Sequence, residues 1–360
     1  MNYSLRLQTL RARLPKLKCD ALAVSHLTNI GYLSGFSGSS GLLLLTRDAA
    51  HFITDFRYKS QAQNQVGAHA EIVIAERGLW REAAKIVSKE RLARVGFEAE
   101  HVSVAAWQEI QKLFKTAQTV PTTRAVETLR LHKDADEMAI LRRAVQIADE
   151  TFAEAVEILR PGLSEREVAA AIENGVKSRG ASGLSFETIV ASGGRGALPH
   201  GVASEKILEH GDMVTIDMGA RFEGYCSDMT RTVCLGRADV QQKEIYELTW
   251  RAQVAALEAM KPGLGCKAAD DIARGIINDA GYKKNFGHGL GHGVGIDIHE
   301  APRLSRLGKG QLAAGMIVTC EPGIYLPDFG GVRIEDMLLI TENGAEVLTG
   351  TPKPERLLEL

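Results

Sequence analysis

Paired cysteines, long hydrophobic runs and an excess of one charge are all missing from this sequence of 360 residues. The five cysteines are odd in number and form no C-x-x-C pair, which argues against a disulfide framework and is typical of a reducing compartment. The basic N-terminus lacks the apolar run of a signal peptide, and no stretch has the length of a membrane span. We therefore expect a cytoplasmic protein without a membrane partner.

The charge balance is also even. The formal net charge is −2 at pH 7, so no basic field predicts a nucleic-acid partner. With 45% hydrophobic and 24% charged residues, the composition is that of an ordinary globular protein. A chain of this length exceeds a typical single core, which indicates two domains. Glycine is frequent, at 36 residues, and many glycines cluster around the motifs described below.

Residues 1–128 are expected to form a smaller α/β domain. Short apolar runs alternate with helix-like segments, which predicts a partly parallel sheet. The predicted strands are Ala21–Val24, Leu42–Leu45, His51–Thr54, Glu71–Ile74 and Arg94–Phe97, and the predicted helices are Ser4–Leu14 (ended by Pro15), Leu79–Lys89 and Val104–Phe114. No segment here has the spacing of a catalytic site, and we interpret Asn29–Tyr32 and Asp55–Tyr58 as structural or substrate-shaping.

Residues 129–360 contain an internal repeat of a long helix, a Pro-Gly-Leu turn and a shorter helix. The helices are expected from about Asp136 to Leu159 and from Ser164 to Gly180, then from about Val240 to Met260 and from Lys267 to Gly281. Each copy precedes a hairpin with two carboxylates, which would place a site on a pseudo-two-fold axis. Chance recurrence of a common helix–turn–helix signal is the weaker alternative, because the hairpins match as well.

The first hairpin carries Asp217 and Asp228. If it is centred between Phe222 and Glu223, the two aspartates face each other, with Cβ atoms about 4.5–5.5 Å apart. Two carboxylates at that distance, among apolar neighbours, repel each other unless a proton or a cation lies between them. The hairpin therefore suggests a metal site, although these residues alone leave open a solvated hairpin with two incidental acids.

The second hairpin carries Glu321 and Glu335, which are equidistant from Asp328 and so can also face each other. The alternation of a strand puts Arg333 on the same side as Glu335. Apolar strand residues surround both acids, which again disfavours a solvated face.

Between the hairpins, His288, His292 and His299 alternate with glycines. A lone histidine is more often a core or surface residue, but three in one short glycine-rich run make that the minority interpretation. A neutral imidazole beside carboxylates is a natural metal ligand, and a histidine outside the coordination shell suits proton transfer or substrate polarisation.

Four carboxylates and one histidine form an oxygen-rich set with a charge of about −4, which two divalent cations would neutralise. Dinuclear sites of this kind activate water and polarise a carbonyl or phosphoryl group, so the set indicates hydrolysis. It disfavours structural zinc, which prefers Cys or His ligands. Mn²⁺, Fe²⁺, Co²⁺ and Zn²⁺ all suit these ligands.

Together these segments resemble the "pita-bread" metallopeptidases of family M24, which include methionine aminopeptidase, Xaa-Pro aminopeptidase, prolidase and creatinase. The matching segments are ALPHG around His200, TIDMGARFEGYCSDMTRT, GHGLGHGVGIDIHE, TCEPGIY and GVRIED. In the first part, TNIGYLSGFSGSSG and TDFRY are similar to the N-terminal domain of the Xaa-Pro peptidases. The resemblance implies an α/β protein whose α+β pita-bread domain, with an internal pseudo-two-fold, follows a smaller creatinase-like domain.

The resemblance also implies the metal ligands. Asp217 and Asp228 would bind one divalent ion, with Asp228 bridging to a second. His292 and Glu321 would bind the second ion, and Glu335 would bridge both. A metal-bridging hydroxide would attack the scissile carbonyl, with Glu321 as the proton carrier. The residues by themselves do not separate Glu321 from Glu335 in that last role.

Four further residues receive roles from the resemblance. His200 and His299 would bind the substrate near the carbonyl and the tetrahedral intermediate, as part of the catalytic set. His288 and Arg333 would help to form the pocket for the proline side. An Xaa-Pro bond has no N–H to donate, so a tight apolar pocket suits it.

The implied activity is cleavage of the Xaa-Pro bond of short proline-containing peptides. We expect an Xaa-Pro aminopeptidase, because no long insertion closes the site, with an Xaa-Pro dipeptidase (prolidase) as the alternative. Methionine aminopeptidase, which in minimal form lacks the first domain, and a non-catalytic binding protein are more remote, and the intact ligand set disfavours a creatinase. Manganese is the expected metal. We also expect a homodimer in which the first domain of one subunit borders the partner's site.

Overall fold

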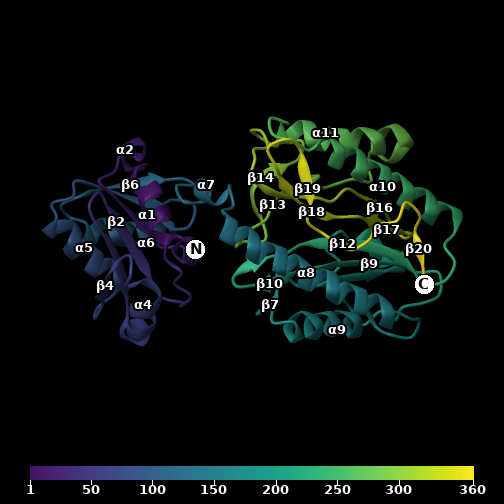
Figure 1. The fold of residues 1–360 in the computed structure, drawn as a ribbon, viewed down its shortest axis with the longest axis horizontal. Helices are drawn as coiled ribbons and strands as arrows, with labels where there is room; N and C mark the ends of the chain where they lie inside the picture. Colours follow the sequence, from purple (N-terminus) through teal and green to yellow (C-terminus); the bar gives the residue numbers. More distant parts are fainter. The chain divides into compact units, whose positions relative to one another are not determined.

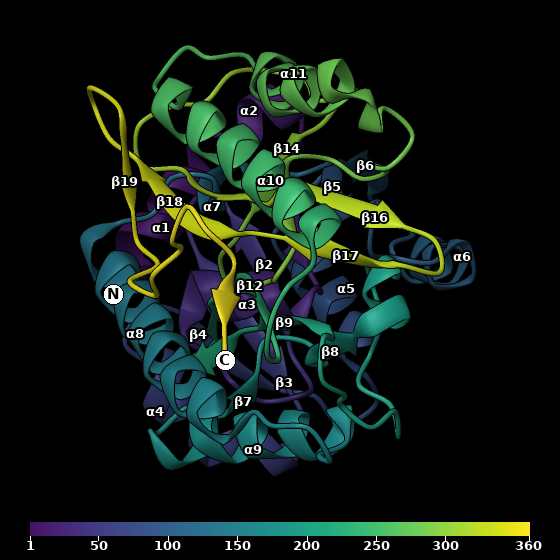
Figure 2. The same cartoon turned by 90° about the vertical axis from the view of Figure 1, so that its right-hand side faces the viewer.

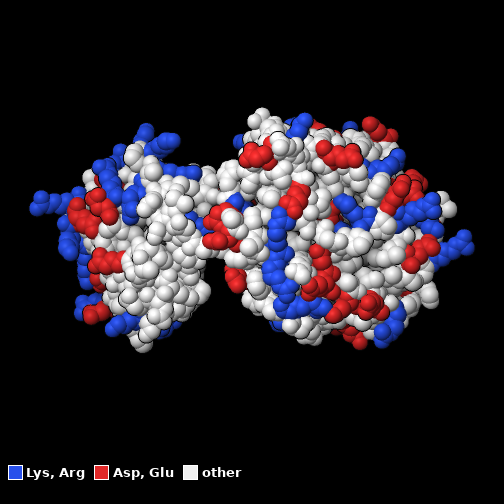
Figure 3. All heavy atoms as spheres, viewed as in Figure 1, with Lys and Arg blue, Asp and Glu red and all other residues white.

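The computed structural model describes all 360 residues, and the chain divides into two compact units, Met1–Arg130 and Leu131–Leu360 (Figure 1). Each unit has its own sheets and apolar cores. All five cysteines are free and buried. None of the helices combines the length and the apolar character that crossing a membrane requires. On the face shown in Figure 3, both units carry basic and acidic side chains, and a broad part of the first unit's visible face carries neither.

The first unit is built on one six-stranded sheet. Its strands are β1 (Ala21–Val24), β2 (Leu42–Thr46), β3 (Ala50–Thr54), β4 (Glu71–Ile74), β5 (Arg94–Glu98) and β6 (Gln118–Thr122). Its helices are α1 (Tyr3–Arg11), α2 (Leu14–Leu17), α3 (Leu27–Ser34), η1 (Phe56–Tyr58), α4 (Lys59–Val66), α5 (Leu79–Lys89), α6 (Val104–Leu113) and α7 (Glu127–Arg130).

The strand order in this sheet is β4-β3-β2-β1-β5-β6. The pairs β1–β5, β5–β6 and β3–β4 are parallel, whereas β1–β2 and β2–β3 are antiparallel, so the predicted partly parallel sheet is confirmed. Strand β6 was not predicted, because its sequence is polar and contains Pro121, which is tolerated at an edge position.

The prediction that Pro15 ends the first helix is wrong. Helix α1 already ends at Arg11, and Pro15 lies in the first turn of the separate helix α2. A proline is favourable there because the N–H groups of a first helical turn have no partner inside the helix.

The second unit contains two helix pairs and the strands between them. Its helical segments are α8 (Ala135–Ile158), α9 (Glu165–Ser178), η2 (Gly193–Ala197), α10 (Val240–Ala259), α11 (Cys266–Ile277) and η3 (Asn278–Tyr282). The strands of its first half are β7 (Gly183–Leu184), β8 (Ile189–Ser192), β9 (Met213–Met218), β10 (Ala220–Phe222), β11 (Tyr225–Cys226) and β12 (Met229–Cys234). Those of its second half are β13 (Gly291–Gly293), β14 (Glu300–Leu304), β15 (Ile317–Cys320), β16 (Gly323–Leu326), β17 (Gly330–Arg333), β18 (Asp336–Ile340), β19 (Ala345–Val347) and β20 (Leu358–Glu359).

The predicted repeat of helix pairs is present in this unit. Capping boxes begin three of the four helices, at Asp134, Ser164 and Asp239, because each side chain accepts a backbone N–H three residues later. In Figures 1 and 2 the pair α8–α9 lies on one side of the strands and the pair α10–α11 on the other. One apolar core joins α8 and α9 to β9 and β12, and a second joins α10 and α11 to β15 and β18.

The register predicted for the first hairpin is wrong. Strands β9 and β12 pair Asp217 with Thr230, not with Asp228. The turn consists of Glu223 and Gly224, both with positive φ, so the hairpin is centred one residue later than expected. Asp217 and Asp228 still share a face, because the error changes the pairing by two residues, the repeat of a strand.

The register predicted for the second hairpin is confirmed. Gly323 pairs with Arg333 between β16 and β17, and Cys320 pairs with Asp336 between β15 and β18. Glu321 and Glu335 occupy matching positions in the short breaks between these strands. The loop around Asp328 is the centre of the hairpin, and Asp328 has a positive φ.

Candidate metal centre

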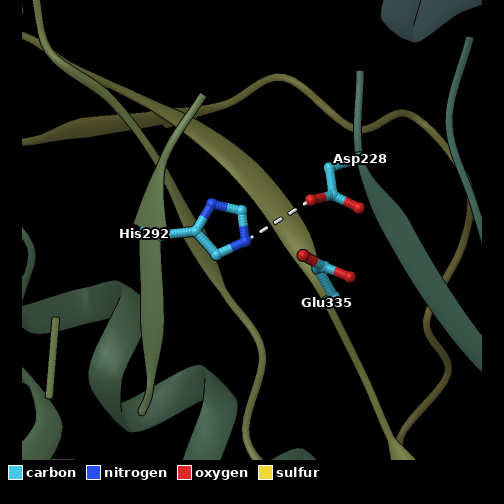
Figure 4. A group of neighbouring side chains, drawn as sticks. All are labelled: Asp228, His292 and Glu335. Atoms are coloured by element: carbon cyan, nitrogen blue, oxygen red, sulfur yellow. Dashed lines mark ion pairs between the residues drawn. The ribbon is translucent and has the colours of Figure 1, made fainter. Parts of the chain in front are cut away.

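Three of the predicted ligands converge at one buried point. Candidate ligand atoms of Asp228, His292 and Glu335 lie within 4.8 Å of one another, and Figure 4 shows the three side chains pointing toward each other. Asp228 directly precedes β12, His292 lies on β13, and Glu335 lies between β17 and β18. Both halves of the repeat therefore contribute to the cluster.

Glu321 and Asp217 lie beside this cluster. Nε2 of His292 is 3.3 Å from Oε1 of Glu321 and 3.6 Å from Oδ2 of Asp228. Asp217 binds Arg333 through Oδ2, while its other oxygen, Oδ1, is buried without a hydrogen-bond partner. The structure thus brings all five predicted ligands into one region of the unit.

The pKa values of Asp228, Glu335 and Glu321 are all raised. Burial raises the pKa of Asp228 well above its usual range, and the charges of Glu335, Asp217 and Glu321 raise it further. Burial also raises the pKa of Glu335 well above its usual range, and the charges of Glu321 and Asp217 raise it further. Burial also raises the pKa of Glu321 to about 8. Buried acids that oppose each other's ionisation, together with an orphaned carboxylate oxygen on Asp217, fit a site built for cations.

His292 is held in the form that binds metals. Its Nδ1 lies 3.0 Å from the carbonyl oxygen of Gly293, so Nδ1 carries the proton and Nε2 faces the carboxylates with a free lone pair. Burial lowers the pKa of His292, which favours the neutral ring. An oxygen-rich set with one such imidazole suits a first-row divalent ion.

Of the other predicted histidines, His299 packs against the cluster through His292. The rings of His292 and His299 are 4.4 Å apart between centroids, and His299 is exposed. His200 is also exposed. Partial burial lowers the pKa of His299, and the charges of His292 and His200 lower it further. Burial lowers the pKa of His288 to about 4, and its Nε2 lies 2.8 Å from the hydroxyl of Tyr325.

The side chain of Arg333 donates four hydrogen bonds to protein groups. Its guanidinium donates to Oδ2 of Asp217 at 2.5 Å and to the hydroxyl of Tyr325 at 2.9 Å. It also donates to the carbonyl of Pro199 and to Oγ1 of Thr230, each at 3.1 Å. Arg333 therefore links the two hairpins through Asp217, a contact between distant segments that the sequence pattern did not predict.

Sequence reasoning also missed three hydroxyl residues. Thr230 donates to Glu335, Thr319 donates to Glu321, and Tyr325 contacts both His288 and Arg333. The correct register of the first hairpin would have placed Thr230 opposite Asp217. Tyr325 stands in the quoted TCEPGIY segment, but no spacing rule gives it a role.

Two family models match the chain. The model described as metallopeptidase family M24 matches residues 139–342, and the model described as the creatinase/prolidase N-terminal domain matches residues 6–132. The chain belongs to metallopeptidase family M24. The resemblance stated from the sequence, including its Xaa-Pro peptidase branch, and the predicted fold class are confirmed. Membership of a metallopeptidase family implies the use of a divalent metal ion.

Three relatives illustrate the similarity. A solved structure of an Xaa-Pro dipeptidase from Bacillus anthracis has a TM-score of 0.97 and 41% identity, and the match covers 100% of both chains. An Xaa-Pro dipeptidase from Pyrococcus horikoshii is 40% identical over 94% of this chain and 95% of its own length. A solved structure of an X-Pro aminopeptidase from Thermotoga maritima has a TM-score of 0.89 and 35% identity, covering 97% of this chain and 100% of that one.

Proposed function

We propose that this M24 metallopeptidase is an Xaa-Pro dipeptidase, which hydrolyses the bond before the proline of a dipeptide. The observation that carries the proposal is the buried cluster of Asp228, His292 and Glu335, with Glu321 and Asp217 beside it. The similarity to two proteins named Xaa-Pro dipeptidase, over nearly the whole length of each, supports the substrate. These relatives favour the dipeptidase alternative over the aminopeptidase that we expected from the sequence.

We propose that the five clustered residues hold two divalent ions, with manganese the first choice and Co, Zn or Fe as alternatives. Such ions supply a water of lowered pKa and polarise the substrate carbonyl. Asp217, Asp228 and Glu335 contribute carboxylate oxygens, and His292 contributes Nε2. Glu321, 3.3 Å from that nitrogen, is proposed to pass the proton of the attacking water to the leaving proline nitrogen.

His200 and His299 are proposed to bind the substrate near its carbonyl. Both histidines are exposed. Because the ring of His299 packs against His292, His299 can contact a ligand beside the cluster. His288 and Arg333 are proposed to form the proline side of the pocket. Tyr325 joins them, because its hydroxyl is hydrogen-bonded to both.

The second candidate is an Xaa-Pro aminopeptidase, which the similarity to the Thermotoga maritima enzyme favours. Both activities need the same ligands and differ in whether the pocket accepts residues after the proline. Methionine aminopeptidase and a non-catalytic binding protein are more remote. Hydrolysis of Xaa-Pro and Met-Ala dipeptides by the Mn²⁺-loaded protein tests these two remote alternatives. We expect cleavage of the Xaa-Pro dipeptide only. Cleavage of Met-Ala alone, or of neither, would refute the proposal.

We also propose that the protein is a homodimer, as expected from the family resemblance. Closed two-fold pairs are the commonest oligomers of globular proteins. Light scattering at micromolar concentration should give twice the chain mass, and the mass of a single chain would refute the dimer.

A further inference from the structure

Glu165, the first residue of α9, is completely buried and accepts five hydrogen bonds. Its Oε1 receives the backbone N–H and the hydroxyl of Ser192, at 2.8 and 2.9 Å. Its Oε2 receives the N–H and the hydroxyl of Ser204, at 3.0 and 2.7 Å, and a guanidinium N–H of Arg195. The carboxylate of Glu165 thus joins two points of the chain, Ser192 and Ser204.

Those two points are the ends of the segment 192–204, which carries His200. Arg195 adds a second tie across this segment, because its Nη2 donates to the carbonyl of Val202 at 2.9 Å. The segment therefore closes on Glu165 from both ends, although beyond Ser192, the last residue of β8, only the short 3-10 helix η2 gives it regular structure. Each end contributes both a backbone N–H and a hydroxyl to the carboxylate, which fixes the path of the chain as well as its side chains.

The closed segment also rests on the strand of Arg333. The backbones of Gly196 and Gly331 are so close that a Cβ on Gly331 would lie 2.2 Å from the carbonyl oxygen of Gly196. Arg333 in turn donates to the carbonyl of Pro199, directly before His200. A shift of the segment would therefore move His200 relative to the metal cluster.

The start of α9 does not need Glu165 as a cap. Ser164 and Glu167 already form a capping box there, in which each side chain accepts the other residue's backbone N–H. The oxygens of Glu165 are directed instead to Ser192, Arg195 and Ser204. Burying a carboxylate is costly unless donors surround it, so this arrangement is a specific one.

We propose that Glu165, together with Arg195, is a positioning residue that holds the segment 192–204 so that His200 meets the substrate carbonyl. The proposal rests on the proposed function, in which His200 binds that carbonyl. Glu165 touches neither the substrate nor a metal ligand and acts through His200.

The test is a double-mutant cycle on the Mn²⁺-loaded enzyme with an Xaa-Pro dipeptide. Glu165→Gln keeps the shape but offers one acceptor oxygen in place of two, so one end of the segment is released. We expect kcat/KM to fall roughly 10- to 100-fold, mainly through kcat, because small misplacements of a reacting group cost about that much. Bound metal should stay at the wild-type level. In a His200→Ala background, Glu165→Gln should change kcat/KM by less than about twofold, because residues that act as a unit are not additive.

Glu167→Ala is the matched control, since it removes a carboxylate from the same helical turn that does not contact the segment. It should lower the melting temperature but leave kcat/KM unchanged. If Glu165→Gln does not fold, Arg195→Gln takes its place in the same cycle, since Arg195 is only half-buried. This variant removes both the ion pair with Glu165 and the hydrogen bond to the carbonyl of Val202.

The outcomes separate the positioning proposal from the proposed function. Additive losses of Glu165→Gln and His200→Ala, with wild-type activity present, overturn only the positioning role. Equal activity of the Glu165→Gln variant and the wild-type protein also overturns the positioning role. An unchanged His200→Ala variant overturns both the positioning role and the proposed role of His200. A wild-type protein that cleaves no Xaa-Pro dipeptide overturns the proposed function and the inference together.

Discussion

Thr230 donates a 2.6 Å hydrogen bond from its hydroxyl to Oε2 of Glu335, across 105 residues of sequence. The other glutamate of the cluster has a similar partner, since Thr319 donates to Oε1 of Glu321 at 3.1 Å. Each hydroxyl occupies one carboxylate oxygen and so fixes the direction of the other. In metal sites, partners of this kind orient the ligands that contact the ion.

Replacing Thr230 by valine should weaken metal binding roughly 10- to 100-fold, because valine keeps the shape but donates no hydrogen bond. Thr230→Ser keeps the hydroxyl and is the control. Titration of the metal-free proteins with Mn²⁺ by calorimetry measures the difference. Equal affinities of the valine variant and wild type would show that this hydrogen bond does not orient Glu335.

Removing either proposed bridging ligand should abolish activity and loosen metal binding. If Asp228 and Glu335 bridge the two ions as proposed, Asp228→Ala and Glu335→Ala would each remove a ligand of both ions, so Mn²⁺ should no longer stabilise these variants against heat. Wild type should gain about 2.7 kcal/mol at a metal concentration 100 times its Kd. Asp271→Ala, which removes a surface carboxylate paired with Lys267, should behave like wild type. Activity within tenfold of wild type in either ligand variant would refute the assignment.

The exposed histidines should separate turnover from metal binding. We expect His200→Ala and His299→Ala to lose roughly 10²- to 10⁴-fold in kcat, the range of acid–base and electrostatic groups, while keeping most of the bound metal. Steady-state kinetics combined with metal analysis of the same samples gives both quantities. Metal content that falls in step with activity would identify these histidines as ligands.

Behind the cluster, Asp336 and Arg231 form a buried ion pair at 2.7 Å, and Arg231 also donates to the carbonyl of Thr230 at 2.9 Å. Asp336→Ala would leave Arg231 buried without this partner, so we expect a loss of about 3–5 kcal/mol in the free energy of unfolding. Urea denaturation measures it, with the exposed ion-pair variant Glu346→Ala as a control that should cost less than about 1 kcal/mol. A loss for Asp336→Ala no larger than that of the control would contradict the expectation.

The local structure of the two hairpins could largely be predicted from the sequence. The register of the second hairpin was predicted correctly, because Glu321 and Glu335 are equidistant from Asp328. The register predicted for the first hairpin was wrong because the turn lies at Glu223 and Gly224. The prediction that Asp217 and Asp228 share a face was still correct, because strand faces repeat every two residues.

Contacts between distant segments were not visible in the sequence. The ion pair of Arg333 with Asp217 and the hydrogen bond of Thr230 to Glu335 join the two hairpins, and neither has a local spacing that marks it. The closure of the segment 192–204 on Glu165 is of the same kind. Such contacts depend on how the repeated halves pack, which periodicity along the chain does not encode.

The most direct test of the central claim compares an Xaa-Pro dipeptide with the matching Xaa-Pro-Yaa tripeptide, using enzyme loaded with Mn²⁺. A site that closes after the proline accepts the free carboxylate of the dipeptide and has no room for a further residue. We therefore predict a kcat/KM for the dipeptide more than about tenfold above that for the tripeptide. Equal or faster hydrolysis of the tripeptide would contradict the dipeptidase and identify an aminopeptidase instead.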